Sequence, residues 1–277
     1  MASTHHDDDH HDEGLAFDVG TLLNRRRALT MLGGASVAVA LAACQGSSSG
    51  TTTSTTAAGA TGTTVAPGST SGAIPEETAG PFPGDGSNGV NVLTQSGIVR
   101  RDITHSFGSA SGVAAGVPLT IELRVLDTKN SSKALVGAAV YLWHCNIDGK
   151  YSLYSQGVTE ENYLRGVQAT DSGGSVTFTS IFPAAYSGRW PHIHFEVYPS
   201  LAKATAATDK LRTSQLALPE AICREVFATS GYSTSIGNLN QTSLATDNVF
   251  SDGWSLQTPT MTGTVAKGLT ATLDVPV

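Results

Sequence analysis

The chain has 277 residues, of which 14% are charged, and its formal net charge at pH 7 is −7. Because it lacks an excess of basic residues, it offers no electropositive face to nucleic acid, and we exclude a nucleic-acid-binding function. Beyond the N-terminal region, roughly 200 residues remain, which is enough for a single domain with a sizeable core.

The N-terminal region predicts export. Arg25 to Arg27 precede an apolar run from Ala28 to Ala43 that is short for a membrane span. The run ends in Leu41-Ala42-Ala43-Cys44, which is similar to a lipobox, so we expect cleavage before Cys44 and lipidation of that cysteine. Residues 1–43 are therefore predicted to be a twin-arginine-like signal peptide. A plain signal peptide followed by a coincidental cysteine is the alternative.

Residues 44–73 follow as a tether, because they are almost wholly Ser, Thr, Gly and Ala and cannot bury enough apolar surface to fold. We expect a protein held by lipid at the outer face of the cytoplasmic membrane, or released outside the cell. The membrane is a partner only through that anchor. Residues 74–277 remain as the folded domain.

The folded domain is predicted to be all-β. Short segments alternate apolar and polar residues between turns rich in Gly, Asp, Ser and Asn, namely 119–126, 138–145, 175–182, 192–198 and 263–275. Only 219–229 has helical spacing, with Pro219 at its start. We predict an antiparallel β-sandwich with one or two short helices.

Two histidines and two tyrosines suggest a metal site among the loops and strand ends. The two-residue period of a strand puts His192 and His194 on one face. Tyr186 and Arg189 precede them, and Tyr151 stands in an upstream Gly-Lys-Tyr-Ser turn. Phenolate is a hard anionic ligand that favours a trivalent ion, so this set of donors indicates Fe(III).

Other assignments compete with this one. Tyr154 and Tyr163 are rival phenol donors, although Tyr154 is three residues beyond Tyr151 and so faces the other side of a regular strand. Tyr163 suits packing or a pocket wall, and His144 suits the core or a supporting position. The His-x-His pair also fits zinc or copper.

Several motifs, in order, resemble the intradiol ring-cleavage dioxygenases, the family of catechol 1,2-dioxygenase and protocatechuate 3,4-dioxygenase. The similarity extends over residues 75–277. The matching pieces are 77–82 (Glu-Thr-Ala-Gly-Pro-Phe), 98–103, 140–144, 149–152, 164–166, 170–171, 186–194 and 214–216. One departure is Trp190-Pro191 where the family more often has Pro-Ala, and Trp190 is expected to alter the pocket wall.

The resemblance implies a role for each residue of the site. Tyr151, Tyr186, His192 and His194 match the ligands of a non-haem Fe(III). Arg189 matches an arginine that stabilises negative charge developing on the substrate ring, and Gln215 matches a glutamine near substrate and metal. Tyr186 is also expected to leave the metal as a base that accepts a substrate proton.

The implied reaction is cleavage of a catechol-type ring between its two hydroxylated carbons, with O₂ as co-substrate and a muconate-type diacid as product. No organic cofactor is needed. An extradiol enzyme is disfavoured because that chemistry uses Fe(II) with two histidines and a carboxylate. The alternative function is a β-sandwich binding or structural lipoprotein that holds zinc or copper at the His-x-His pair.

The remaining cysteines, Cys145 and Cys223, suit an oxidising compartment. We predict a disulfide between them, linking the strand before the Tyr151 turn to the helix. Two buried free thiols are the alternative.

Overall fold

The computed structural model describes residues 72–277. The predicted signal peptide, Cys44 and nearly all of the predicted tether lie outside the described residues, so those assignments stay predictions. Among residues 72–277 no helix has the length and apolar character needed to cross a membrane.

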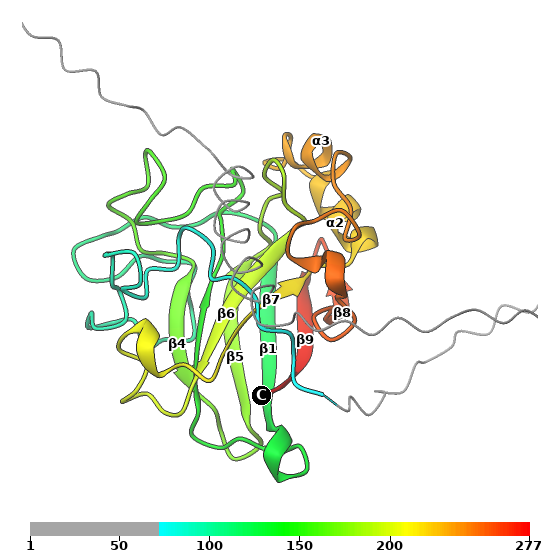
Figure 1. Cartoon of the computed structure of the whole chain (residues 1–277). Coiled ribbons are helices and arrows are strands. Elements are labelled where there is room, and N and C mark those ends of the chain that lie inside the picture. The colour runs from blue at the N-terminus through cyan, green and yellow to red at the C-terminus, as the bar shows by residue number, and fades with distance from the viewer. Residues whose placement is uncertain (1–71) are drawn as a thin grey trace, which may run out of the picture.

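The domain is built mainly from strands, with few and short helices (Figure 1). In chain order the elements are β1 (Pro118–Asp127), η1 (Thr128–Asn130), β2 (Lys133–Ala134), β3 (Ala139–Trp143), β4 (Arg165–Ala169), β5 (Ser175–Ile181), β6 (His192–Tyr198), η2 (Ala207–Asp209), β7 (Arg212–Ala217), α2 (Glu220–Phe227), α3 (Ser235–Leu239), η3 (Phe250–Asp252), β8 (Thr260–Thr264) and β9 (Gly268–Pro276).

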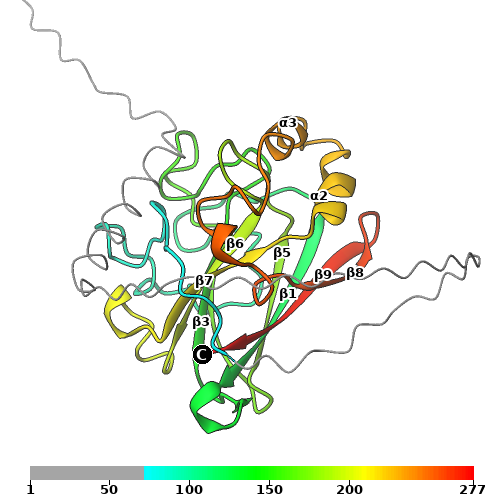
Figure 2. The same cartoon turned by 45° about the vertical axis from the view of Figure 1, so that its right-hand side comes forward.

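The strands form two sheets. One has the order β2-β1-β9-β8, with β5 also paired to β1, and the other has the order β4-β3-β6-β7. The predicted sandwich is confirmed, with one exception to its antiparallel character: β1 and β9 pair in parallel, from Leu119 with Leu269 to Leu126 with Pro276. Strands so far apart in sequence are not joined by a hairpin, and so nothing local forces them to run antiparallel. Figure 2 shows β9 beside β1, with α2 and α3 together at one end of the domain.

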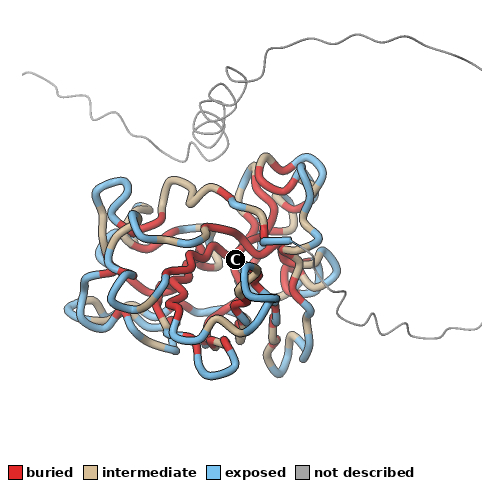
Figure 3. Tube along the Cα trace, turned by 60° about the horizontal axis from the view of Figure 1, so that its bottom comes forward, coloured by how far each residue is buried: buried red, intermediate tan, exposed pale blue. Residues whose placement is uncertain are grey.

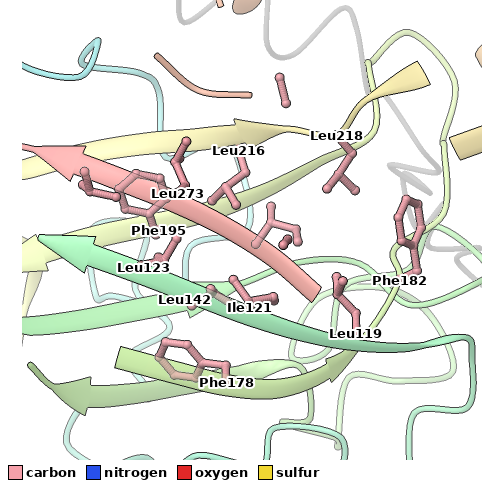
Figure 4. Packing of buried hydrophobic residues seen from close by; sticks show 14 of the residues in the cluster. Leu119, Ile121, Leu123, Leu142, Phe178, Phe182, Phe195, Leu216, Leu218 and Leu273 are labelled. Atoms are coloured by element: carbon pink, nitrogen blue, oxygen red, sulfur yellow. The ribbon is translucent and has the colours of Figure 1, made fainter. Parts of the chain in front are cut away.

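The principal core lies between the sheets. Ile121 and Leu123 of β1 alternate with more exposed neighbours and meet Leu142 of β3 and Phe195 of β6 in one buried cluster (Figure 4). Each fully buried side chain of this size contributes about 1.5–3 kcal/mol of transfer free energy. The cluster accounts for one face of the β4-β3-β6-β7 sheet.

The other face of that sheet is buried as well. All seven residues of β6 are buried, and a second cluster contains Tyr141, Trp143 and Tyr198 together with Tyr151 from the turn after β3. The long connections of the domain supply the cover on this face, and Figure 3 shows buried chain through the middle of the molecule with exposed loops around it. This second face carries the predicted metal donors.

The predicted disulfide is absent from the structure, where Cys145 and Cys223 are buried free thiols. Cys145 belongs to the second cluster and Cys223 to the principal core, so the two side chains occupy separate packing environments. Each Sγ lies 3.7 Å from a main-chain carbonyl oxygen, that of Ala184 for Cys145 and that of Leu218 for Cys223. The alternative of two buried thiols is the correct one.

Candidate metal centre

Three separate segments bring four donor side chains to one place. His192 and His194 lie on the same face of β6, Tyr186 comes from the connection between β5 and β6, and Tyr151 follows β3. The Nε2 atoms of the two histidines are 3.0 Å apart, and Nε2 of His192 lies 3.2 Å from the Tyr186 hydroxyl and 3.5 Å from the Tyr151 hydroxyl. The two hydroxyls are also 3.5 Å apart.

Two glycines allow the chain to pass close to these donors. Gly149 has φ +77°, and a Cβ placed there would lie 3.0 Å from Cβ of Tyr186. Gly80 has φ +70°, and a Cβ there would lie 3.3 Å from Cε1 of His194. Only glycine combines a positive φ with such close approach at little cost. The glycines in the Gly-Lys-Tyr-Ser and Thr-Ala-Gly-Pro motifs therefore serve the packing around the site.

The histidines present lone pairs rather than charges. Burial lowers the pKa of both imidazoles, and Arg189 lowers that of His192 further. Nδ1 of His192 lies 2.5 Å from the main-chain oxygen of Trp190, so Nδ1 carries the proton and Nε2 is left as the metal-binding atom. Burial, followed by the neighbouring Tyr186, raises the pKa of Tyr151 well above its usual range. Ionising this phenol therefore calls for a cation beside it.

The four donors fit a metal ion. Nitrogen and oxygen ligands sit roughly 2.0–2.2 Å from an ion such as zinc, so neighbouring ligands lie about 3 Å from one another. The four measured separations, 3.0 to 3.5 Å, meet this requirement. Within residues 72–277, no group of three or more His, Cys, Asp and Glu side chains is arranged to hold a metal ion. A metal ion at this site would therefore need the tyrosines as ligands in addition to the two histidines.

A buried cation lies next to the donors. Arg189 donates from Nε to Oδ2 of Asp247 at 3.0 Å and from an Nη to Oε1 of Gln215 at 2.8 Å. Gln215 in turn donates to the main-chain oxygen of Thr78 at 2.9 Å. The register of β6 with β7 sets Gln215 directly opposite His194. The predicted association of Arg189 and Gln215 with the metal donors is thus present in the fold.

The rival donors lie elsewhere. The Tyr154 hydroxyl accepts from the Gly84 main chain and donates to Asn88, at 2.8 and 2.9 Å. Tyr163 packs in a third small cluster, and its hydroxyl accepts from Asn146 at 3.4 Å. His144 is a buried core residue, with Nε2 2.7 Å from the Ser180 hydroxyl. Burial lowers its pKa to about 4.

Trp190 was expected in the pocket wall, and that expectation is wrong. The indole packs in the principal core, where Nε1 donates to the main-chain oxygen of Leu218 at 2.8 Å. The tryptophan that stands where the family more often has proline therefore packs in the core between the sheets.

Sequence reasoning missed several buried polar residues around the site. Asp247 and Gln257 stand in the polar connection between α3 and β8 and carry no motif. Gln257 donates to Oε1 of Glu77 at 3.2 Å, and burial raises the pKa of Glu77 to about 7. Arg165 is buried and donates to main-chain oxygens of Phe82, Pro83 and Ser152 at 2.9 Å. Its position in the Leu-Arg-Gly motif was the one available signal.

A shallow, mostly apolar pocket of about 610 Å³ opens near the start of β1, between residues 115–118, Ile147, 229–230 and 265–266. It contains none of the four donors. The four donors therefore lie away from this pocket, on the second buried face of the β4-β3-β6-β7 sheet.

Comparisons with known proteins show similarity to dioxygenases. The dioxygenase family profile Dioxygenase_C matches residues 100–196, which include all four donors and Arg189. The domain is similar in this region to the intradiol ring-cleavage dioxygenases. A curated relative, chlorocatechol 1,2-dioxygenase of Rhodococcus opacus, is 30% identical over 93 residues, a match that covers 29% of this chain and 35% of that protein. The match thus spans about a third of the curated dioxygenase.

Two solved structures share the fold. An intradiol ring-cleavage dioxygenase from Tetranychus urticae is 23% identical with a TM-score of 0.57, and the similarity covers 74% of this chain and 94% of that one. A second dioxygenase is 22% identical with a TM-score of 0.58 over 74% of this chain and 93% of its own. At these identities the likeness concerns the dioxygenase fold alone.

Proposed function

We propose that this chain is a non-haem Fe(III) intradiol dioxygenase that cleaves catechol-type diols between their hydroxylated carbons, with O₂ as co-substrate and a muconate-type diacid as product. The observation that carries the proposal is the convergence of two phenols and two neutral imidazoles beside the buried Arg189–Gln215 pair. Phenolate donors select a trivalent ion, and that ion would supply the Lewis acidity that draws electron density from a chelated diol ring.

The protein residues divide the remaining work. Tyr151 and the two histidines are buried, whereas Tyr186 is only partly buried. Tyr186 is therefore the donor best placed to exchange with a substrate and to accept one of its hydroxyl protons at the phenolate oxygen. Arg189, held beside the donors without bulk water, stabilises negative charge that develops on the ring oxygens during cleavage.

The zinc or copper alternative has less support. A zinc site built on His192 and His194 needs further His, Cys or carboxylate ligands, and none gathers there within residues 72–277. A binding module also has no need of Arg189 and Gln215 joined at 2.8 Å beside the donors. We keep the export of the protein and its lipid anchor at Cys44 within the proposal, so the diol would be met outside the cytoplasm.

The deciding experiment is a visible absorption spectrum of purified, metal-analysed protein, before and after catechol is added without oxygen. We expect a broad tyrosinate-to-iron charge-transfer band that shifts with catechol, followed by oxygen uptake and a diacid product on admission of air. Zinc-loaded protein is the control and should stay colourless and inactive. An iron-loaded protein that also stays colourless would overturn the proposal and favour the binding lipoprotein.

A further inference from the structure

The strongest unassigned feature of the domain is the carboxylate of Asp247, in the connection after α3. Oδ2 accepts from Nε of Arg189 at 3.0 Å and from the main-chain N–H of Trp190 at 2.7 Å. Oδ1 accepts from the main-chain N–H groups of Val249 and Phe250 at 2.9 and 3.1 Å. Both side chains of the ion pair are essentially inaccessible, at 1% and 0% exposure. Asp247 is thus a buried anion whose two oxygens each accept two hydrogen bonds.

The two bonds of Oδ2 join this connection to the segment that carries the site, and the two bonds of Oδ1 hold the carboxylate to its own turn. Arg189 is held from one side by Asp247 and from another by Gln215, and two such contacts fix the plane of a guanidinium group. Trp190 is held at its N–H by Asp247, and its carbonyl accepts the Nδ1 proton of His192. One carboxylate therefore supports both the arginine and the residue that fixes the tautomer of a metal donor.

A stabilising role alone does not account for this arrangement. A buried ion pair is weak grounds for stability, because desolvation of the two charges offsets their attraction. Two of the Asp247 contacts are instead directed to successive residues, Arg189 and Trp190, which are separated from His192 only by Pro191. Errors of about 1 Å in the placement of a catalytic group reduce rates by about 100-fold, so such support matters for catalysis.

We propose that Asp247 is a positioning residue that acts through Arg189, holding its guanidinium plane toward the metal donors and keeping the turn before His192 in register. The inference rests on the proposed function for its catalytic consequence, but the positioning itself is measurable without metal. Asp247 lies outside residues 100–196, the region that the family profile matches, so the proposal extends the site beyond that region.

The first test uses metal-free protein. Phenylglyoxal labels accessible arginines, and peptide mapping resolves each site. We expect Arg189 to be protected in the wild type and to react at least about tenfold faster in Asp247→Asn, because the buried negative charge that pairs with the guanidinium is lost. Arg165, equally buried and held by other groups, is the internal control and should stay protected. Glu196→Gln alters another buried carboxylate, which pairs with Lys210, and should leave Arg189 protected. Wild-type labelling of Arg189 in Asp247→Asn would overturn the proposal.

The second test is a double-mutant cycle on iron-loaded protein with catechol. We expect kcat to fall about 10- to 100-fold in Asp247→Asn with little change in KM, and the Arg189→Gln/Asp247→Asn double variant to be no slower than Arg189→Gln. Additive losses would show that Asp247 does not act through Arg189. If the wild type itself takes up no oxygen, the proposed function fails, and the labelling result still decides the positioning.

Asp247→Glu covers the case in which the asparagine variant does not fold. It keeps the negative charge and moves the carboxylate by one methylene. We expect the protein to fold and to bind iron with the wild-type absorption band, yet to lose kcat about tenfold or more. A folded Asp247→Glu with wild-type kcat would contradict the positioning role.

Discussion

Among the four donors, Tyr186 differs in being partly exposed, whereas Tyr151, His192 and His194 are buried. Its hydroxyl still lies 3.2 Å from Nε2 of His192, so it belongs to the donor set. The combination gives it two tasks in the proposed reaction, as a ligand and as an acceptor of a substrate proton. The other three donors are buried, and in the proposed reaction they would remain bound to the metal throughout.

Replacing the Tyr186 phenol should affect its roles as a metal ligand and as a proton acceptor. We expect Tyr186→Phe to weaken iron binding by at least about 10- to 100-fold, the loss typical of a disturbed ligand environment, and to diminish the charge-transfer band. Tyr154→Phe is the matched control, because Tyr154 bonds to Gly84 and Asn88 away from the donors. Metal titration followed by visible spectroscopy measures both effects. Equal spectra for the two variants would remove Tyr186 from the ligand set.

Glu77 is a second residue with a measurable signature. Its pKa is raised from 4.5 to about 7, by burial first and then by Asp252. Between those two values the folded protein holds a proton that the unfolded chain has lost, so this residue's contribution to stability declines as pH rises through about 7.

Glu77→Gln should remove this dependence while keeping an acceptor for Gln257. We expect the free energy of unfolding of the variant to increase relative to that of the wild type between about pH 5 and about pH 8, as measured by urea denaturation. Glu225→Gln, on the exposed side of α2, is the control and should show a constant difference. A constant difference for Glu77→Gln as well would mean that the Glu77 carboxyl titrates normally.

At the scale of elements, whether a strand could be predicted depended on the pattern of polar and apolar side chains along it. The segment 192–198 was predicted with the bounds that β6 has, because aromatic and branched residues alternate there. β4 and β7 were missed, since Arg165, Thr213, Ser214 and Gln215 are polar yet buried in hydrogen-bond networks. The helix at 219–229 was correct to within two residues at its C-terminus, and α3 was not predicted.

The site shows the same division. The four donors and Arg189 could be predicted from the sequence because they lie in motifs with a family resemblance. Asp247 sits in Thr-Asp-Asn, a sequence typical of any turn, so its long-range bond to Arg189 left no local pattern. Contacts between residues 58 positions apart depend on how the whole chain folds, and a single sequence does not encode them as a spacing.

The Gly149 turn yields a prediction at this scale. Gly149→Ala and Gly137→Ala place a Cβ at positions with the same φ of +77°, and each should cost about 1–2 kcal/mol in backbone strain. Only at Gly149 does the new Cβ meet another residue, Tyr186, at 3.0 Å, whereas Gly137 has open space. We expect the iron absorption band to shift in Gly149→Ala alone. Identical spectra for the two variants would show that the turn does not determine the position of Tyr186.

For the whole molecule, the two buried clusters explain why the domain does not use a disulfide. Cys145 and Cys223 lie in different clusters, and burial raises the pKa of both thiols, that of Cys145 to about 12. Stability is therefore expected to come from apolar packing on both faces of the β4-β3-β6-β7 sheet, independently of the redox state of its surroundings.

Thiol chemistry tests this directly on residues 74–277. We expect both cysteines to resist a thiol reagent in the native state and to react fully after denaturation, and the melting temperature to be unaffected by reductant. Labelling of an exposed cysteine introduced by Ser87→Cys confirms that the reagent is active. If the denatured protein reacted with the reagent only after reduction, the two cysteines would be joined by a disulfide after all.

The parallel pairing of β1 with β9 has a consequence for how the protein is made. β9 lies between β1 and β8, and its pairing with β1 extends from Leu269 to Pro276. While the ribosome still holds these residues in its exit tunnel, β1 has no partner on that edge. The four donors and β7 have already been synthesised by then, whereas Asp247 and Gln257 come later. Emergence of β9 is thus the event that completes the first sheet, and a nascent chain stalled before β9 would expose the edge of β1 that β9 covers.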